Sequence, residues 1–227
     1  MTELASSRLI VDILFGFGAL FAIINPYGLA FVFFDRTMGL SKRERERIAL
    51  QVAIYAFGVL LISLFVGSQI LNFFGVSVPA LRIAGGLVVA ASGWSMLHAS
   101  SPALDVHETS TANFATVRKM TFFPLTMPLT TGPGTIATAI AIDANRPRGL
   151  NSQLTTTVSS LVVALAVTAT IYHAYRMSSA MARLFGEEGT RVLTRLSAFL
   201  LLCIGVQIII TGVVEVMRPI LENVPRS

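Results

Sequence analysis

Six apolar runs, each long enough to cross a lipid bilayer, constrain this chain more than any other feature. They cover residues 9–34, 48–71, 81–97, 120–142, 154–174 and 196–216. A membrane-spanning helix needs about 20 mainly apolar residues, and about 17 suffice. A buried core of a soluble protein can explain one such run, but hardly six. The runs therefore predict an all-α, polytopic membrane protein with six transmembrane helices.

The charged residues fit a membrane protein. They make up 13% of the 227 residues, whereas a soluble domain carries about 25%. Of the 17 lysines and arginines, 11 fall in loops on one side of the predicted membrane, which the positive-inside rule assigns to the cytoplasm. Both termini are then expected outside. The basic residues sit in short loops and form no basic domain, so nucleic acid is not an expected partner.

Two of the apolar runs are interrupted by proline and glycine at corresponding places. The first interruption reads Asn25-Pro26-Tyr27-Gly28, and the second reads Thr130-Thr131-Gly132-Pro133-Gly134 after two earlier prolines, Pro124 and Pro128. Each lies in the opening run of one half of the chain. Paired interruptions of this kind are the best sequence-level indication of a transporter's central site.

The residues at each interruption are typical of a helix that stops and restarts. Asn25 is a favoured N-cap and Pro26 a favoured first helical residue, and Thr131 or Gly132 can cap a helix that begins at Pro133. The start of a helix presents free N–H groups and a partial positive charge, which favour an anionic group. Ordinary kinks are the alternative, because proline and glycine are common in membrane helices.

We therefore predict a solute site where the two restarted helices meet near the bilayer midplane. Polar residues near the middles of the third and sixth runs are added as further candidates. The predicted substrate-binding residues are Asn25, Pro26, Gly28, Thr130, Thr131, Gly132, Pro133, Gly134, Ser92 and Gln207.

The third and sixth runs align without gaps, which indicates an internal repeat. Arg82 begins one and Arg195 the other, and residues 72–75 match 183–186 upstream of them. Three helices per half place the second half in the membrane the other way up, an inverted repeat. The predicted units are a first repeat at 1–99, a polar cytoplasmic linker at 100–117 and a second repeat at 118–227. Arg82 and Arg195 are candidates for gating or charge pairing, with anchoring at the membrane surface as the alternative.

A face of small residues on the third run permits close helix packing. It consists of Gly85, Gly86, Ala90 and Gly93. Small residues at such positions let two membrane helices approach closely. The face fits either the core of the bundle or a contact within a homo-oligomer, and the sequence does not choose between them.

These motifs resemble the MarC family of six-helix inner-membrane proteins. The resemblance lies in Asn25-Pro26-Tyr27-Gly28, the Arg82–Gly86 opening, the Pro124–Gly134 block and Gly205-Val-Gln207. It covers nearly the whole chain and implies the bacterial inner membrane, a fold related to exporters of amino acids, and no settled substrate. The family usually has a proline three residues after Gly28, where this chain has Phe31, so we expect a milder first break.

The function that fits best is a secondary transporter, an exporter of a small polar or anionic, amino-acid-like solute, working by alternating access. Its expected partners are the bilayer and that solute. A passive solute or water channel and a non-transporting scaffold are the alternatives. We expect no enzyme, because no acid/base or nucleophile arrangement lies at membrane depth. No cofactor is expected, and no histidine, cysteine or carboxylate cluster has metal-ligand spacing.

Overall fold

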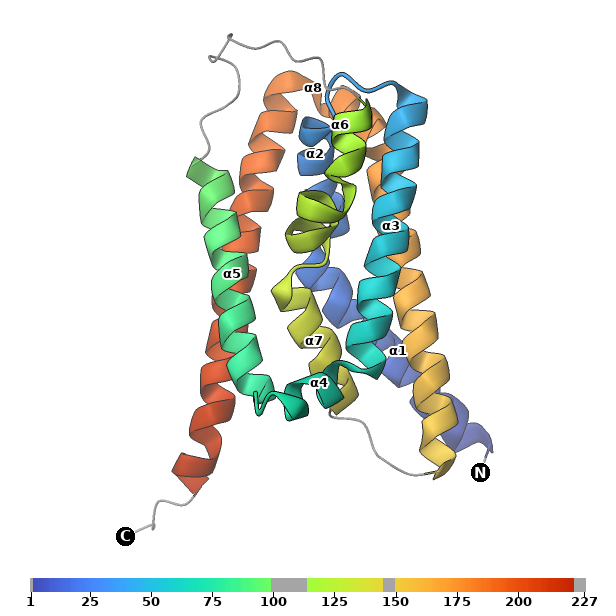
Figure 1. The fold of residues 1–227 in the computed structure, drawn as a ribbon, viewed down its shortest axis with the longest axis vertical. Helices are drawn as coiled ribbons and strands as arrows, with labels where there is room; N and C mark the ends of the chain where they lie inside the picture. The colour runs from blue at the N-terminus through green and yellow to red at the C-terminus, as the bar shows by residue number, and fades with distance from the viewer. Residues whose placement is uncertain (1, 99–113, 145–149, 223–227) are drawn as a thin grey trace.

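The computed structural model describes residues 2–98, 114–144 and 150–222, and within them every regular element is a helix. The helices stand side by side in an upright bundle, and α1 begins at the same end at which α8 ends (Figure 1). The elements are α1 (Thr2–Ile24), α2 (Pro26–Arg36), α3 (Lys42–Phe65), α4 (Gly67–Phe73), α5 (Val78–His98), α6 (Phe114–Lys119), the π-helical η1 (Thr121–Thr130), α7 (Pro133–Ala144) and α8 (Leu150–Glu222).

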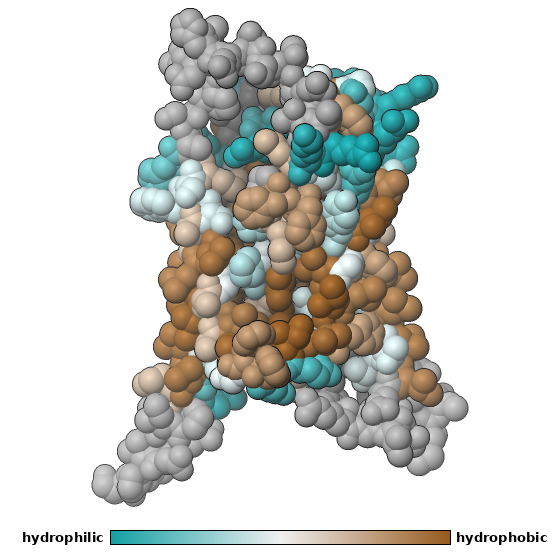
Figure 2. Space-filling model, viewed as in Figure 1, coloured by the Kyte–Doolittle hydropathy of each residue, from teal (hydrophilic) through white to brown (hydrophobic). Residues whose placement is uncertain are grey.

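Five helical stretches are long and apolar enough to cross a membrane. They are Leu9–Arg36, Lys42–Phe65, Val78–His98, Leu154–Gly186 and Glu188–Arg218. Apolar residues form a belt between two more hydrophilic ends (Figure 2). The remaining predicted run, 120–142, is divided between η1 and α7, neither of which is long enough alone. The prediction of an all-helical membrane protein is confirmed. Among the described residues, five spans are found where six were predicted, because the fourth run is interrupted.

The long element α8 is two helices that meet at Gly186. Gly186 has φ 68° and ψ −175°, a conformation open to glycine because it has no Cβ. The chain reverses there, so 150–185 and 187–222 form two arms, the first beside α3 and the second beside α5 (Figure 1). Gly75, which follows α4, has nearly the same φ of 66°. The sequence alignment of 72–75 with 183–186 thus pairs two glycines with positive φ.

The small-residue face of α5 packs inside the chain, against the second arm of α8. A Cβ atom added at Gly86 would lie 2.7 Å from the carbonyl oxygen of Gly205, and one at Gly93 would lie 2.5 Å from the amide nitrogen of Leu202. The two helices run antiparallel and touch through their backbones. The sequence left open whether this face packs in the bundle core or in a homo-oligomer contact. The structure places it in the core of the bundle.

The buried core lies among α1, α2, α3, η1, α7 and the first arm of α8. Its largest fully buried side chains include Tyr175, Phe33, Leu20 and Ile24. Many large apolar side chains on the outer surface are exposed instead, Phe15 and Leu154 among them. An apolar exterior around a packed interior is the arrangement a lipid solvent favours, because lipid tails are as apolar as the side chains.

The predicted linker 100–117 lies mostly outside the described residues, which resume at Phe114. The end of α2, the start of α3, α6 and the turn at Gly186 all lie at one end of the bundle (Figure 1). This is the end that carries most of the lysines and arginines counted above. Its assignment to the cytoplasm stays a prediction.

Candidate solute site at the two interrupted spans

The first interruption is confined to one residue, Asn25. Its backbone is left-handed, with φ 45° and ψ 60°, and α2 begins directly after it at Pro26. The Asn25 side-chain oxygen accepts a hydrogen bond from the amide of Gly28 at 3.3 Å. Backbone bonds continue on both sides, from Asn25 N–H to the Phe21 carbonyl and from Leu29 N–H to the Asn25 carbonyl, each at 2.9 Å. The predicted cap and restart are confirmed, and the break is mild.

The second interruption extends over a whole segment. Phe123 and Met127 within η1 have extended backbone, with ψ 122° and 128°. Thr131 at the end of η1 is also non-helical, with φ −117° and ψ 67°, and α7 begins at Pro133. The predicted restart at Pro133 is confirmed. The unwinding reaches back to Phe123 because Phe123 and Met127 each directly precede a proline, a position at which the α-helical backbone is disfavoured.

Threonine hydroxyls bond the carbonyl groups of this unwound segment. Thr126 donates to the Thr121 carbonyl at 2.7 Å, and Thr130 donates to the Leu125 carbonyl at 2.7 Å. Thr131 donates to the Thr126 carbonyl at 3.2 Å. Freed backbone groups at membrane depth require such partners because lipid supplies none. The threonine hydroxyls therefore help to make an irregular backbone tolerable here.

Tyr175 of α8 connects the second interruption to the restarted helix of the first. Its hydroxyl lies 2.8 Å from the Thr130 hydroxyl, and its ring stacks on Phe33 of α2 with centroids 4.4 Å apart. The Tyr175 side chain is fully buried. Sequence reasoning missed this residue. The available signal was a tyrosine directly after the fifth apolar run, because a buried tyrosine hydroxyl usually finds a partner.

Two further buried hydroxyls, those of Thr168 and Ser178 on the same helix, have no hydrogen-bond partner among the described residues. Thr168 precedes Tyr175 by two helical turns and so lies on the same face of α8. Of the buried side chains that the structure describes, one is charged, that of Arg45 at the start of α3. Among the described residues, the interrupted segments themselves are polar through hydroxyls and backbone dipoles, and they contain no charged residue.

The start of α7 is packed against α5. A Cβ atom added at Gly85 would lie 2.9 Å from the Pro133 carbonyl oxygen, and one at Gly134 would lie 2.8 Å from the Val89 side chain. Thr130, Thr131, Gly132 and Gly134 are all buried, while Asn25 and Gly28 are half-buried. Both interruptions lie in the middle part of the bundle's long axis (Figure 1).

The two other predicted binding residues lie on the helix pair α5–α8. The Ser92 hydroxyl donates to the Val88 carbonyl of its own helix at 2.7 Å. Gln207 is exposed on the second arm of α8. Neither has a described contact with the interrupted segments, so a role in binding stays a prediction for both.

Arg82 and Arg195 lie at opposite ends of the α5–α8 pair. Arg82 forms an ion pair with Glu215 of α8, near the end where α8 finishes. Arg195 is exposed and lies closer to the turn at Gly186. The two arginines are thus not neighbours. Among the described residues, no three histidines, cysteines or carboxylates gather in a way that could hold a metal ion.

Comparison with known proteins identifies the family. The model of the MarC family integral membrane proteins matches residues 10–217. The chain is 34% identical to the inner membrane protein MarC of Citrobacter koseri and 35% identical to that of Salmonella typhimurium. Each match covers 89% of this chain and 94% of the relative. No solved structure matches the chain. On this evidence, the chain belongs to the MarC family of integral membrane proteins.

Proposed function

We propose that this chain is a secondary transporter, an exporter of a small polar or anionic, amino-acid-like solute, with its site between the two interrupted spans. The observation that carries the proposal is the pair of helices restarting at Pro26 and Pro133. Tyr175 joins the two through Thr130 on one side and Phe33 on the other. Helix breaks at membrane depth persist where they line a cavity or protein interior.

The chemistry of the surroundings favours a carboxylate or another small anionic group. Two helix starts supply N–H groups and partial positive charge. The hydroxyls of Thr130, Thr131 and Tyr175 lie beside the second start, and each would have to exchange a hydrogen bond made within the protein for one to the solute. The interrupted segments themselves contain no charged residue, so binding of a full double charge would lack compensation. A zwitterion or a monovalent anion is the better match.

Alternating access is proposed to use two inverted repeats. Three features support the repeats: the two broken spans, the left-handed glycines Gly75 and Gly186, and the antiparallel packing of the equivalent helices α5 and 187–222. One ion pair lies toward each end of the bundle, Arg82–Glu215 and Arg176–Glu46. We propose that Arg82–Glu215 opens and closes access at the end opposite the cytoplasm.

Reconstitution in liposomes tests the transport proposal. Purified protein would be assayed for saturable counterflow with a panel of radiolabelled amino acids and monocarboxylic acids. We expect saturable flux of at least one, abolished in Asn25→Ala and Gly132→Ala and retained in Thr211→Val, whose exposed hydroxyl bonds its own helix at 2.9 Å. Flux that never saturates would favour a passive channel. No flux and no thermal stabilisation by any solute would favour a scaffold.

A further inference from the structure

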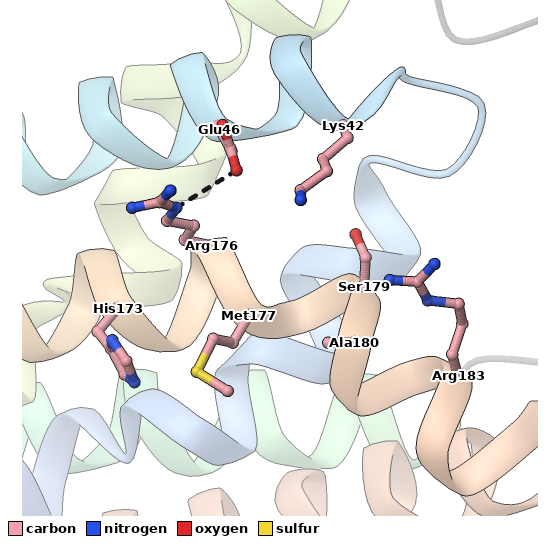
Figure 3. Close-up of a pocket in the computed structure, with 8 residues that line it drawn as sticks. All are labelled: Lys42, Glu46, His173, Arg176, Met177, Ser179, Ala180 and Arg183. Atoms are coloured by element: carbon pink, nitrogen blue, oxygen red, sulfur yellow. Dashed lines mark hydrogen bonds and ion pairs between the residues drawn. The ribbon is translucent and has the colours of Figure 1, made fainter.

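A charged cleft lies between α3 and α8, away from the interrupted spans. It has a volume of about 270 Å³, and its walls include Lys42, Glu46, Arg176, Met177, Ser179 and Arg183. The side chains come from the first turns of α3 and from the last turns of α8 before Gly186 (Figure 3). The cleft thus lies at the basic end of the bundle, where the candidate spans Lys42–Phe65 and Leu154–Gly186 have their ends.

The cleft has an excess of positive charge. Arg176 Nε donates to Glu46 Oε1 at 3.3 Å, so the carboxylate in the cleft is already paired. Lys42 and Arg183 form no ion pair with any side chain that the structure describes. In Figure 3 the Lys42 amine extends from α3 toward α8, and the Arg183 guanidinium lies near the Ser179 hydroxyl. Two cations and a hydroxyl facing one opening favour an anion with several oxygen atoms.

Ser179 is held in place by Arg45 from behind the cleft. Arg45 donates from one guanidinium nitrogen to the Ser179 hydroxyl oxygen, and from another to the carbonyls of Thr37 at 3.0 Å and Leu40 at 3.2 Å. The Ser179 oxygen is therefore an acceptor toward Arg45. Its proton has no acceptor among the described residues and is available to a ligand in the cleft.

The helix face that lines the cleft carries charged and apolar side chains together. Arg183, Ala180, Met177 and Arg176 recur at three- and four-residue spacing and so share one face of α8. Met177, between the two arginines, is 41% exposed, and His173 lines the next turn of the helix. A ligand with an anionic head and an apolar tail can contact the cations and the Met177 side chain at the same time.

We propose that this cleft binds an anionic phospholipid, with the headgroup phosphate between Lys42, Arg183 and Ser179 and an acyl chain along Met177. Anionic lipids attract basic residues at the membrane surface by about 1 kcal/mol each, which is about a fivefold change in affinity. The site does not depend on transport and does not use the residues of the interrupted spans.

Native mass spectrometry of the full chain in neutral detergent tests the proposal. Phosphatidylglycerol and phosphatidylcholine with the same acyl chains would be titrated side by side. We expect a preference for phosphatidylglycerol that falls about thirtyfold in the Lys42→Gln/Arg183→Gln double variant and by a smaller factor in Ser179→Ala. All three positions lie at the surface or near it, and a melting curve would verify that each variant is folded.

Arg47→Gln is the matched control, because Arg47 is exposed on the same helix, at the same end, and does not line the cleft. Its preference should equal that of the unmodified protein. An equal loss in Arg47→Gln would overturn the proposal in favour of general surface charge. Equal binding of the two lipids would also overturn it. Glycerol 3-phosphate competing as well as the lipid would assign the cleft to a soluble anion instead.

Discussion

Both interrupted spans restart a helix at a proline, but the backbone before the proline differs between them. At the first, a single left-handed residue, Asn25, turns the helix axis and caps the next helix with its own side chain. At the second, the backbone departs from the α-helix from Phe123 onward, and three threonine hydroxyls bond carbonyls of the segment. The first break depends on one side chain, whereas the second is distributed over a segment. The second should therefore be the more sensitive to steric change, and the first to the loss of one polar group.

We expect the largest difference in the free energy of unfolding between two glycine variants, one at each break. A Cβ atom at Gly132 would lie 2.5 Å from the Pro128 carbonyl oxygen, which is backbone, whereas one at Gly28 would lie 2.3 Å from the Asn25 side-chain amide, which can move. We expect Gly132→Ala to lower the free energy of unfolding by about 3 kcal/mol through overpacking. Gly28→Ala should cost about 1 kcal/mol, the value of a lost cap. Unfolding in mixed micelles measures both. Equal losses of unfolding free energy in the two variants would show that the two breaks are equally sensitive to an added Cβ atom.

Two substitutions of Asn25 separate the stability contributed by its left-handed backbone from that contributed by its capping side chain. Asn25→Ala loses the cap and also places alanine in the left-handed region, for a total of about 2 kcal/mol. Asn25→Gly loses the cap alone, because glycine adopts positive φ freely. We expect the alanine variant to be the less stable of the two in the same unfolding assay. The reverse order would contradict the left-handed assignment at this residue.

Tyr175→Phe tests the connection between the two regions. The ring stays on Phe33, and the hydrogen bond to Thr130 is lost, at a cost of about 1 kcal/mol. A double-mutant cycle with Thr130→Val, measured by the same unfolding titration, should give a non-zero coupling energy. Additive losses would mean that the two hydroxyls do not interact.

We expect the smallest change in the free energy of unfolding from substitution of single threonines by valine. Thr126→Val removes a hydroxyl that bonds the irregular segment at 2.7 Å, and Thr170→Val removes one that bonds the Ala166 carbonyl in a continuous helix at 2.8 Å. Loss of one such bond costs about 1 kcal/mol. We expect Thr126→Val to be the more destabilising of the two, because the Thr126 hydroxyl is fully buried, whereas the bond made by Thr170 is only partly buried. Equal values would show that the threonines at the break have no special role.

The breaks could be predicted from the sequence because the residues act locally. Proline at the first helical position and asparagine before it fix a helix start with little help from the rest of the fold, and both α2 and α7 begin at the expected proline. The aligned glycines at 75 and 186 are local in the same sense, since a residue without a Cβ adopts positive φ most readily.

The remaining features depend on contacts between distant parts of the chain. The meeting of Tyr175 with Thr130 and Phe33 arises from packing. The pairing of Arg82 with Glu215 likewise joins α5 to the end of α8. Sequence spacing carries no record of these partners. The predicted roles of Ser92 and Gln207 rested on their depth along the helix, and depth alone does not say which way a side chain points.

The contact between Gly86 and Gly205 has a mechanical consequence. Where two helices meet at their main chains, no layer of side chains lies between them to compress or slide. The contact recurs along the pair, at Gly93 beside Leu202 and at Gly212 beside Pro79. The two helices therefore have little freedom to separate or tilt against each other, and a rearrangement elsewhere in the bundle would carry them together.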